Sequence, residues 1–355
     1  MPHGSAEPRR VSVVTGAAGF LGSHLWRLIA ARGDELRVLV RPGDDLSALD
    51  GLRLTAVHGD ARSAEDLDRL FAGLSPGSPD SPVSPGSSGA SAHPRITVHH
   101  LASRITIESR VAPEVRDVNV GGTRQVIDAC RRHGAARLVY VSSVHAIPEP
   151  ADASDPIVEP AVFDPDAVVG GYAKTKAEAT QLVLDADDGE LSTVVVMPSG
   201  IVGPGDPGDG YLTALVRDIA DGSLTSDVDG GYDFVDVRDV AAGCIEAAER
   251  GRPGASYILT ARRMDMAEIV RVCRSAVGKR TLTSVLPMWF ARGVAPLAEG
   301  WYRMLRKPPL FTSYALHTLR SPGVFRTDRA RADLGWNPKD PADSLRDVVR
   351  ERTGG

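Results

Sequence analysis

A run of β-branched residues that ends in a glycine-patterned turn is the feature that most constrains how this chain folds. VSVVT at 11–15 leads directly into TGAAGFLGSH at 15–24. Gly16 allows a tight turn from strand to helix, Gly19 removes a Cβ where a pyrophosphate would approach the backbone, and Gly22 lets helix and strand pack closely. The helix N-terminus presents free N–H groups and the positive end of its dipole to a phosphate. The spacing G-x-x-G-x-x-G differs slightly from the G-x-G-x-x-G fingerprint, but its position between a first strand and a first helix predicts a dinucleotide site rather than a plain turn.

Short apolar runs alternate with helical patterns through the first half of the chain. The expected strands are 11–15, 37–40, 54–58, 96–102, 137–143 and 192–198, with helices near 20–32, 64–70 and 118–134. This alternation is typical of a parallel sheet that is covered on both faces, whose strands are nearly continuous apolar runs. The sequence therefore predicts an α/β fold, a Rossmann-type doubly wound parallel sheet with a smaller C-terminal substrate-binding domain.

Composition shifts along the chain suggest where these domains begin and end. Residues 75–94 consist almost wholly of Ser, Pro, Gly and other small residues, which bury too little apolar surface to offset their ordering entropy, so we expect a disordered surface insertion there. The expected parts are a flexible tail at 1–10, a dinucleotide-binding domain at 11–198 to which 233–250 return, and a substrate-binding domain made of 199–232 and 251–350.

The composition excludes several classes of protein. The 355 residues include 41 Lys plus Arg and 46 Asp plus Glu, a formal net charge of −5, so a nucleic-acid partner is not expected. Three scattered cysteines are too few for a disulfide framework or a thiolate metal site. No run of about 18 apolar residues is present, so no membrane span is expected. Arg9-Arg10 precede a glycine-patterned turn instead of an apolar signal helix, and we predict a cytoplasmic protein.

The end of the second expected strand bears on the choice of dinucleotide. An acidic residue there would bind the ribose 2′-hydroxyl of NAD, whereas an arginine can hold the 2′-phosphate of NADP. The strand ends at Val40 and Arg41 follows, with no acid before Asp44. Arg41 offers a planar guanidinium to a phosphate and favours NADP, although Asp44 and Asp45 nearby argue against a bound phosphate and NAD stays open.

Three residues form a candidate catalytic set. Tyr172 and Lys176 lie four apart in YAKTK, on one face of a predicted helix. A tyrosine has an unperturbed pKa near 10, and a nearby lysine ammonium and a cationic nicotinamide both favour the phenolate. Ser143 ends the strand LVYVSS and could hydrogen-bond the same substrate oxygen. A Tyr and Lys at this spacing are commonly a surface pair, but the glycine turn, the serine strand and the tyrosine helix occur together here.

With these elements in that order, the chain resembles the extended short-chain dehydrogenase/reductase superfamily, the NAD-dependent epimerase/dehydratase group. The pattern PPLFTSYALHTLR followed by ARADLGWNP is similar to its dihydroflavonol-reductase and 3β-hydroxysteroid-dehydrogenase branch. The matching segments are TGAAGFLG (15–22), HGDA (58–61), HHLAS (99–103), NVGGT (119–123), VYVSS (139–143), YAKTK (172–176), MPSGIVGPGD (197–206), FVDVRDVAAG (234–243) and ARADLGW (330–336).

The resemblance implies roles for individual residues. It implies that Ser143, Tyr172 and Lys176 are catalytic and that the last two also contact the cofactor. It also implies that Asp60 and Ala61 lie near the adenine, that Ala102, Ser103 and Asn119 line the cofactor site, and that Pro198 and Ser199 lie beside the nicotinamide. With the residues of the glycine turn and the end of the second strand, the other expected cofactor-binding residues are Gly16, Gly19, Phe20, Leu21, Gly22 and Arg41.

Departures from the family pattern indicate the substrate class. Sugar-nucleotide epimerases of this group usually carry R-x-x-N before the G-P element and an arginine before the V-x-D strand, and here Met197, Gly200 and Tyr232 stand at those places. A diphosphate would lack its charge-assisted partners. Apolar and aromatic residues instead suggest a pocket for an apolar ketone or alcohol, although ordinary core packing explains any one of them equally well. They are Tyr211, Leu212, Tyr232, Trp289, Phe290, Phe311 and Tyr314.

We therefore expect an NAD(P)-dependent oxidoreductase that interconverts a ketone and a secondary alcohol on a largely apolar small molecule. The main alternative is a nucleotide-sugar epimerase or dehydratase with tightly bound NAD. Two others are a non-enzymatic NADP-binding regulator, against which the intact Ser-Tyr-Lys set argues, and a membrane-surface helix at 289–307, against which Pro296 argues. Dimerisation through a two-helix face is usual for the superfamily and would make the chain a homodimer, but nothing in the sequence shows it.

Overall fold

A computed structural model describes most of the chain. The described residues are 9–44, 54–74, 94–106, 111–152, 154–207, 210–224, 227–280, 285–286, 319 and 323–353. Three expectations lie wholly or mostly outside them: the tail, of which 9–10 are described, the low-complexity insertion, of which 94 is described, and the aromatic stretch from Trp289 to Tyr314. In the described part of the chain, no helix is long and apolar enough to cross a membrane.

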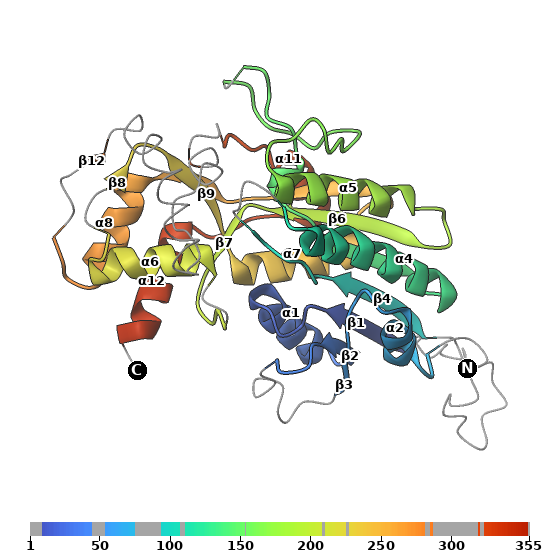
Figure 1. Ribbon diagram of the computed structural model, residues 1–355. Coiled ribbons are helices and arrows are strands. Elements are labelled where there is room, and N and C mark those ends of the chain that lie inside the picture. Colours follow the sequence, from blue (N-terminus) through green and yellow to red (C-terminus); the bar gives the residue numbers. More distant parts are fainter. Residues whose placement is uncertain are drawn as a thin grey trace, which may run out of the picture.

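A seven-stranded parallel sheet forms the centre of the protein (Figure 1). Its order is β10-β6-β5-β4-β1-β2-β3, and each neighbouring pair is parallel. The strands are β1 (Arg10–Thr15), β2 (Glu35–Val40), β3 (Leu54–His58), β4 (Arg95–His100), β5 (Arg137–Val141), β6 (Ser192–Pro198) and β10 (Ala255–Leu259). The strand order reverses between β1 and β4, so a crevice for a ligand is expected at the carboxyl ends of these two strands.

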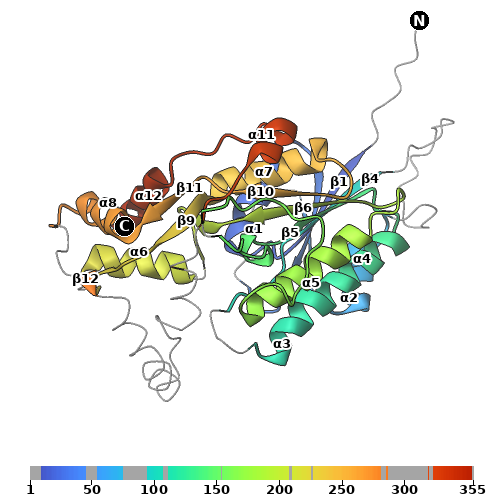
Figure 2. The same cartoon turned by 90° about the horizontal axis from the view of Figure 1, so that it is seen from above.

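Helices cover both faces of this sheet, as Figure 2 shows. On one face lie α1 (Phe20–Ala31), α7 (Val237–Arg250) and α11 (Asp328–Leu334), and on the other α2 (Ala64–Phe71), α4 (Thr123–Arg132) and α5 (Gly171–Asp185). The inner strands are buried along almost their whole length, whereas β3, at the edge, is partly exposed. The predicted doubly wound α/β fold is confirmed.

A smaller mixed sheet continues from the carboxyl end of β6. It has the order β11-β9-β7, from β11 (Arg262–Asp265), β9 (Gly231–Asp236) and β7 (Gly200–Val202). Only Ser199 separates β6 from β7, so this residue marks the passage from one sheet to the other. The small sheet shares an apolar core with α6 (Tyr211–Asp221), α8 (Met266–Ala276) and α12 (Pro341–Thr353), and β8 (Asp227–Val228) pairs with β12 (Val285–Leu286) nearby.

The structure differs from the sequence-based outline in two places. Strand β10 pairs with β6 in the large sheet, although residues from 251 onward were expected in the smaller domain. A lone short strand after a helix carries no signal of which sheet it joins. The expected helix at 118–134 continues from α3 (Pro113–Arg116) through a π-helical segment, Asp117–Gly122, into α4. At the start of α4, the Thr123 hydroxyl donates to the Asn119 carbonyl oxygen over 2.7 Å. Such π-helical segments commonly lie at functional sites. The division into two domains stays a prediction.

A short bridge ties the C-terminal part to the loop that precedes α5. Ile157 N donates to Val324 O over 2.7 Å, and Arg326 N donates to Ile157 O over 2.9 Å. Phe163, farther along the same loop, is buried, and its N–H donates to the Gln181 side chain on α5. The loop is thus held between the C-terminal segment and the helix that it leads into.

The packing of the glycine turn gives a first prediction. A Cβ on Gly22 would overlap the Gly16 carbonyl oxygen and crowd Ala17, whereas one on Gly33 would meet nothing within 4 Å. Gly33 has φ 77°, so Gly33→Ala should cost about 1–2 kcal/mol of left-handed strain. Gly22→Ala should cost about 3 kcal/mol or more in the free energy of unfolding, because backbone must move. Urea unfolding of both variants checks this, and equal costs would contradict it.

Candidate functional site

The glycine turn forms a cradle of bare backbone. Gly16 has φ 75°, and a Cβ there would lie 2.7 Å from the Ala102 nitrogen. A Cβ on Gly19 would meet only the Gly16 oxygen within 4 Å, so the outer side of this residue is open. Gly19 caps α1 with no side-chain hydrogen bond, and no acidic residue stands in the first turn of the helix. The helix N-terminus is therefore free to receive an anion, and the cradle fits the pyrophosphate of a dinucleotide.

Phe20 and Leu21, the first two residues of α1, follow the cradle directly. Leu21 is buried in the core, and the ring of Phe20 lies edge-on to His24, with centroids 5.8 Å apart. Their backbone N–H groups are the first of the helix, which have no intrahelical acceptor. At these two positions it is therefore the backbone N–H groups, and not the side chains, that can bind a phosphate.

Three predicted cofactor-binding positions lie just beyond the ends of β2 and β3. The side chain of Arg41 is 81% exposed, and its guanidinium bonds Asp44 Oδ1 over 3.1 Å. Asp60 accepts three hydrogen bonds from the Arg62 guanidinium, which holds the pKa of the Asp60 carboxyl below its usual range. Ala61 beside it is buried. Gly59 N donates to Val40 O over 2.9 Å and brings these two strand ends together.

Ser143 and Lys176 meet at the carboxyl end of β5. Ser143 follows this strand and caps a short 3₁₀ turn, Val144–Ala146, by accepting from His145 N over 3.3 Å. Lys176 Nζ donates to Val141 O over 2.9 Å and to the Tyr140 hydroxyl over 3.3 Å. Both acceptors belong to the same strand end, so α5 directs its lysine at the strand that positions the serine.

Tyr172 stands one helical turn before Lys176 on the same face of α5. Its side chain is buried, and its ring lies edge-on to His145, with centroids 6.3 Å apart. His145 is two residues beyond Ser143, so the structure gathers all three predicted catalytic residues around the end of β5. Gly171, just before the tyrosine, packs against Val111, which leaves no space for a larger residue.

The amine of Lys176 is the most perturbed group of the set. Its side chain is 2% exposed, and among the described residues its hydrogen-bond partners are one carbonyl and one hydroxyl, with no carboxylate. Burial therefore lowers the pKa of Lys176 to about 7. A lysine held in this way can be charged or neutral near neutral pH, which suits a role in proton chemistry.

Asn119 joins the loop after β4 to helix α5. Its Oδ1 accepts from Ser103 Oγ over 3.1 Å and from Arg104 N over 2.8 Å. Its Nδ2 donates to Arg104 O and to Thr175 Oγ1. The predicted residues Ala102, Ser103 and Asn119 therefore lie in one connected group beside Gly16, and Asn119 acts there as a structural clamp.

Pro198 and Ser199 lie at the end of β6, next to the end of β5, because Ser142 N donates to Val196 O over 2.8 Å. Ser199 is buried beside Asp233 of β9. Burial raises the pKa of Asp233 to about 7, and Ser199 and Arg263 partly oppose this rise. The sequence predicted no role for four polar residues that lie at or near this site: Asp233, His145, Tyr140 and His100. A polar residue inside a strand that is otherwise apolar, as in ITVHH and RLVYV, was the available signal.

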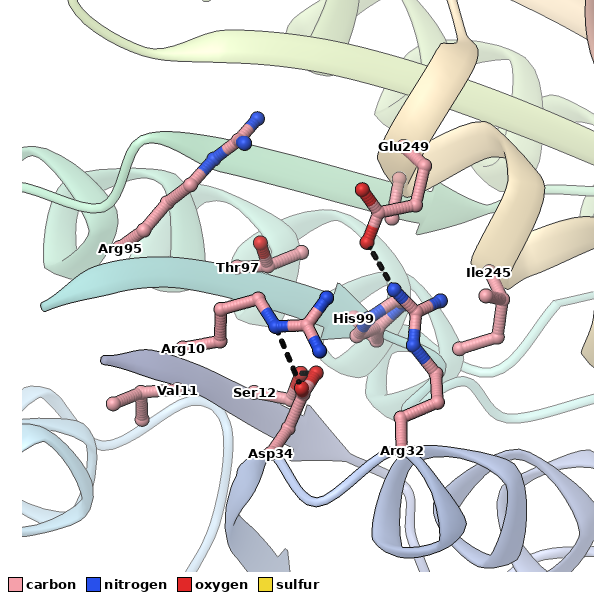
Figure 3. Close-up of a pocket in the computed structure, with 11 residues that line it drawn as sticks. Arg10, Val11, Ser12, Arg32, Asp34, Arg95, Thr97, His99, Ile245 and Glu249 are labelled. Carbon is pink, nitrogen blue, oxygen red and sulfur yellow. Dashed lines mark hydrogen bonds and ion pairs between the residues drawn. The ribbon is translucent and has the colours of Figure 1, made fainter. Parts of the chain in front are cut away.

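A hollow at the opposite end of the central strands is not part of this site. It lies at the amino ends of β1 and β4 and is lined by Arg10, Arg32, Asp34, His99 and Glu249 among others (Figure 3). Arg10 pairs with Asp34 over 3.1 Å, and Arg32 pairs with Glu249. Burial and the charge of Arg32 lower the pKa of His99 to about 4, so it is neutral at ordinary pH. The charged groups of the hollow largely satisfy one another.

Comparisons with known proteins identify the family. Residues 12–77 and 90–259 match the NAD dependent epimerase/dehydratase family. The chain belongs to this family. It is an NAD(P)-dependent oxidoreductase of the extended short-chain dehydrogenase/reductase type, as the resemblance implied.

Two curated relatives and one solved structure cover nearly the whole chain. Sterol demethylase protein B of Methylococcus capsulatus is 29% identical, over 96% of this chain and 98% of the relative. A 2-alkyl-3-oxoalkanoate reductase of Stenotrophomonas maltophilia is 28% identical, over 92% and 94%. The crystal structure of gox2253 superimposes with a TM-score of 0.77 at 28% identity, covering 97% of this chain and 98% of that chain.

The buried amine of Lys176 gives a second prediction. Its pKa is below that of a lysine in the unfolded chain, so the unfolded state binds more protons between pH 7 and pH 10. Burying the charge therefore destabilises the fold fully below pH 7, and this cost fades as the pH rises. Relative to Lys176→Met, the free energy of unfolding of the unaltered protein should rise by roughly 3 kcal/mol from pH 7 to pH 10.

Lys174→Met is the matched control for that measurement. Lys174 lies on the same helix, its side chain is 47% exposed, and it pairs with Asp166 over 2.9 Å. Denaturant unfolding at several pH values should show no comparable pH-dependent difference for this variant. A flat difference for Lys176→Met as well would mean that the buried amine keeps an ordinary pKa.

Proposed function

We propose that this protein interconverts a ketone and a secondary alcohol on a largely apolar small molecule, with NADP as the preferred cofactor. The observation that carries the proposal is the convergence of Ser143, Tyr172 and Lys176 at the end of β5, with the lysine amine buried and unopposed by a carboxylate among the described residues. The two relatives named above, a sterol protein and an oxoalkanoate reductase, support an apolar substrate.

Each residue has a definable part in the reaction. The nicotinamide, when bound, supplies or accepts the hydride. In the reductive direction the Ser143 hydroxyl holds the carbonyl oxygen, and the Tyr172 phenol gives its proton to that oxygen as negative charge develops there. The Lys176 ammonium favours the phenolate that remains and so lowers the barrier to this proton transfer. Gly16, Gly19 and the N-terminus of α1 hold the pyrophosphate.

The described part of the substrate region supports an uncharged substrate. Where sugar-nucleotide enzymes of the family carry an arginine before the V-x-D strand, this chain has Tyr232, whose ring lies 5.8 Å from that of Phe234. Burial raises the pKa of Tyr232 to about 12. Leu212 approaches Gly200, at the place of the family asparagine. A diphosphate would find a buried phenol and an apolar contact at these positions instead of charged partners.

Removal of the Tyr172 hydroxyl tests the mechanism. Tyr172→Phe should lower turnover about 10²–10⁴-fold, because the proton donor is lost. Affinity for NADPH should stay within about threefold, because the cradle and the ring are kept. Turnover is read at the nicotinamide absorbance on a panel of steroid, 3-oxoalkanoate and aryl ketones. Tyr257→Phe, which removes a buried hydroxyl from β10, is the control and should keep its activity.

The same experiment distinguishes the alternative function. A nucleotide-sugar epimerase or dehydratase would convert UDP- or dTDP-sugars without added cofactor, since its oxidation is transient. Conversion of those sugars, with no turnover on the ketone panel, would replace the proposed reaction. Near-normal ketone turnover by Tyr172→Phe would remove the catalytic assignment itself.

Arg41 gives the cofactor prediction. Its exposed guanidinium can exchange Asp44 for a 2′-phosphate, a charge-assisted bond worth about 1.5–3 kcal/mol. Arg41→Ala should therefore weaken NADPH binding about 10–100-fold and leave NADH binding unchanged, measured by nicotinamide fluorescence. Arg69→Ala, which removes a surface arginine paired with Asp66 on α2, is the control. An equal loss for both dinucleotides would argue against a 2′-phosphate contact.

A further inference from the structure

A buried row of polar side chains runs from the amine of Lys176 to the glycine cradle. Lys176 Nζ donates to the Tyr140 hydroxyl over 3.3 Å, and the Thr123 hydroxyl lies beside that of Tyr140. His100 Nε2 lies 3.0 Å from Thr123 Oγ1, and His100 Nδ1 lies 2.7 Å from Thr15 Oγ1. All five side chains are at most 2% exposed. The row crosses α5, β5, α4, β4 and β1 and reaches the residue before Gly16.

Backbone groups at the row determine which atom donates and which accepts. The Thr123 hydroxyl gives its one proton to Asn119 O over 2.7 Å, so its oxygen can only accept from its other neighbours. His100 must then carry its proton on Nε2 and accept from the Thr15 hydroxyl at Nδ1. Burial, with the charge of Lys176, lowers the pKa of His100 to about 3, so the ring stays neutral.

The same reasoning orients Tyr140. Its hydroxyl oxygen accepts from Lys176 Nζ, so its proton must point away from the lysine, toward the side where the Thr123 hydroxyl lies. The ring of Tyr140 is stacked on His100, with centroids 5.5 Å apart, and the Lys176 nitrogen lies 4.9 Å from the centroid of the Tyr140 ring. Both the oxygen and the ring face therefore favour the ammonium form of the lysine.

We propose that Tyr140 and His100 are positioning residues that hold the Lys176 ammonium between the Tyr172 phenol and the glycine cradle without using a carboxylate. This inference rests on the proposed function. His100 holds the Tyr140 ring by stacking and the Thr123 hydroxyl by its Nε2 proton. Tyr140 in turn supplies the side-chain acceptor that, beside the Val141 carbonyl, keeps the lysine charged.

Few other ionisable groups face the lysine. Tyr172 lies on its own helix, and His145 faces Tyr172 from the turn after β5. On the outer side of the same helix, Glu178 pairs with Arg116, at the surface. In the described part of the chain the charge of Lys176 is thus balanced by dipoles alone. An acidic partner would keep the lysine permanently charged and would weaken its effect on the phenol.

The lysine content of the chain allows a direct measurement. The sequence contains five lysines, Lys174, Lys176, Lys279, Lys307 and Lys339. In protein labelled with ¹³C at lysine Cε, five signals can be followed by NMR from pH 5 to pH 11, and Lys176→Met assigns the one of interest. This titration needs neither a substrate nor a cofactor.

Tyr140→Phe removes the acceptor and keeps the ring. The midpoint of the Lys176 titration should fall by at least about half a pH unit, because loss of the acceptor destabilises the ammonium. Tyr257→Phe, the control on β10, should leave it unchanged. Thr123→Val should also lower the midpoint, because it frees the Tyr140 proton to turn toward the lysine, and Thr123→Ser should restore it. An unchanged midpoint in Tyr140→Phe would overturn the proposal.

Catalysis supplies a second readout that separates this inference from the proposed function. With a ketone identified from the panel, the kcat–pH profile of Tyr140→Phe should move to lower pH by about the same amount, with little change in KM. An unmoved kcat–pH profile would overturn the positioning role even where Tyr172→Phe is inactive. If Tyr172→Phe keeps its turnover, the proposed function fails, while the NMR titration still tests the contact.

Discussion

The close approach of the glycine turn to the chain after β4 is the contact on which the rest of the site depends. Gly16 packs its bare Cα against the backbone of Leu101 and Ala102, and Gly22 packs against Gly16 in turn. Any side chain at either position would push β1, β4 and α1 apart. Since β1 and β4 flank the point where the strand order reverses, this contact determines both the width of the crevice and the place of the Asn119 clamp next to it.

A second constraint comes from burying polar groups in a sheet that is covered on both faces. Thr15, His100 and Tyr140 all stand in inner strands and are essentially inaccessible to solvent. Such groups are costly unless they find partners. Along β1, β4 and β5 the partners are one another, the Thr123 hydroxyl of α4 and finally the Lys176 amine. The buried polar side chains of the large sheet and the Lys176 amine therefore form one row of neighbouring polar groups.

Much of this arrangement was predictable from the sequence, and for definite physical reasons. The apolar run at 11–15 and the glycines that follow it form a local pattern that is typical of one geometry. The first strand, the turn and the first helix were therefore all predicted. Tyr172 and Lys176 were recognisable because helical periodicity places them on one face. The place of β10 in the large sheet and the contact of Asp233 with Ser199 were not, because each depends on long-range pairing that no local pattern records. The π-helical segment at Asp117–Gly122 was missed because helical periodicity does not distinguish it from an α-helix. The aromatic positions from Trp289 to Tyr314 stay predictions.

The bridge between Ile157 and the strand-like segment at Val324–Arg326 has a consequence for how the protein can be shortened or tagged. The last helices look like an appendage of the small sheet, yet the segment leading to them pins the loop from which Tyr172 emerges. Removing the residues from Val324 onward would therefore release the loop before α5 from this support, although Tyr172 lies about 150 positions upstream. The segment at Val324–Arg326 thus supports the loop that leads into α5, and removing it is not a neutral change.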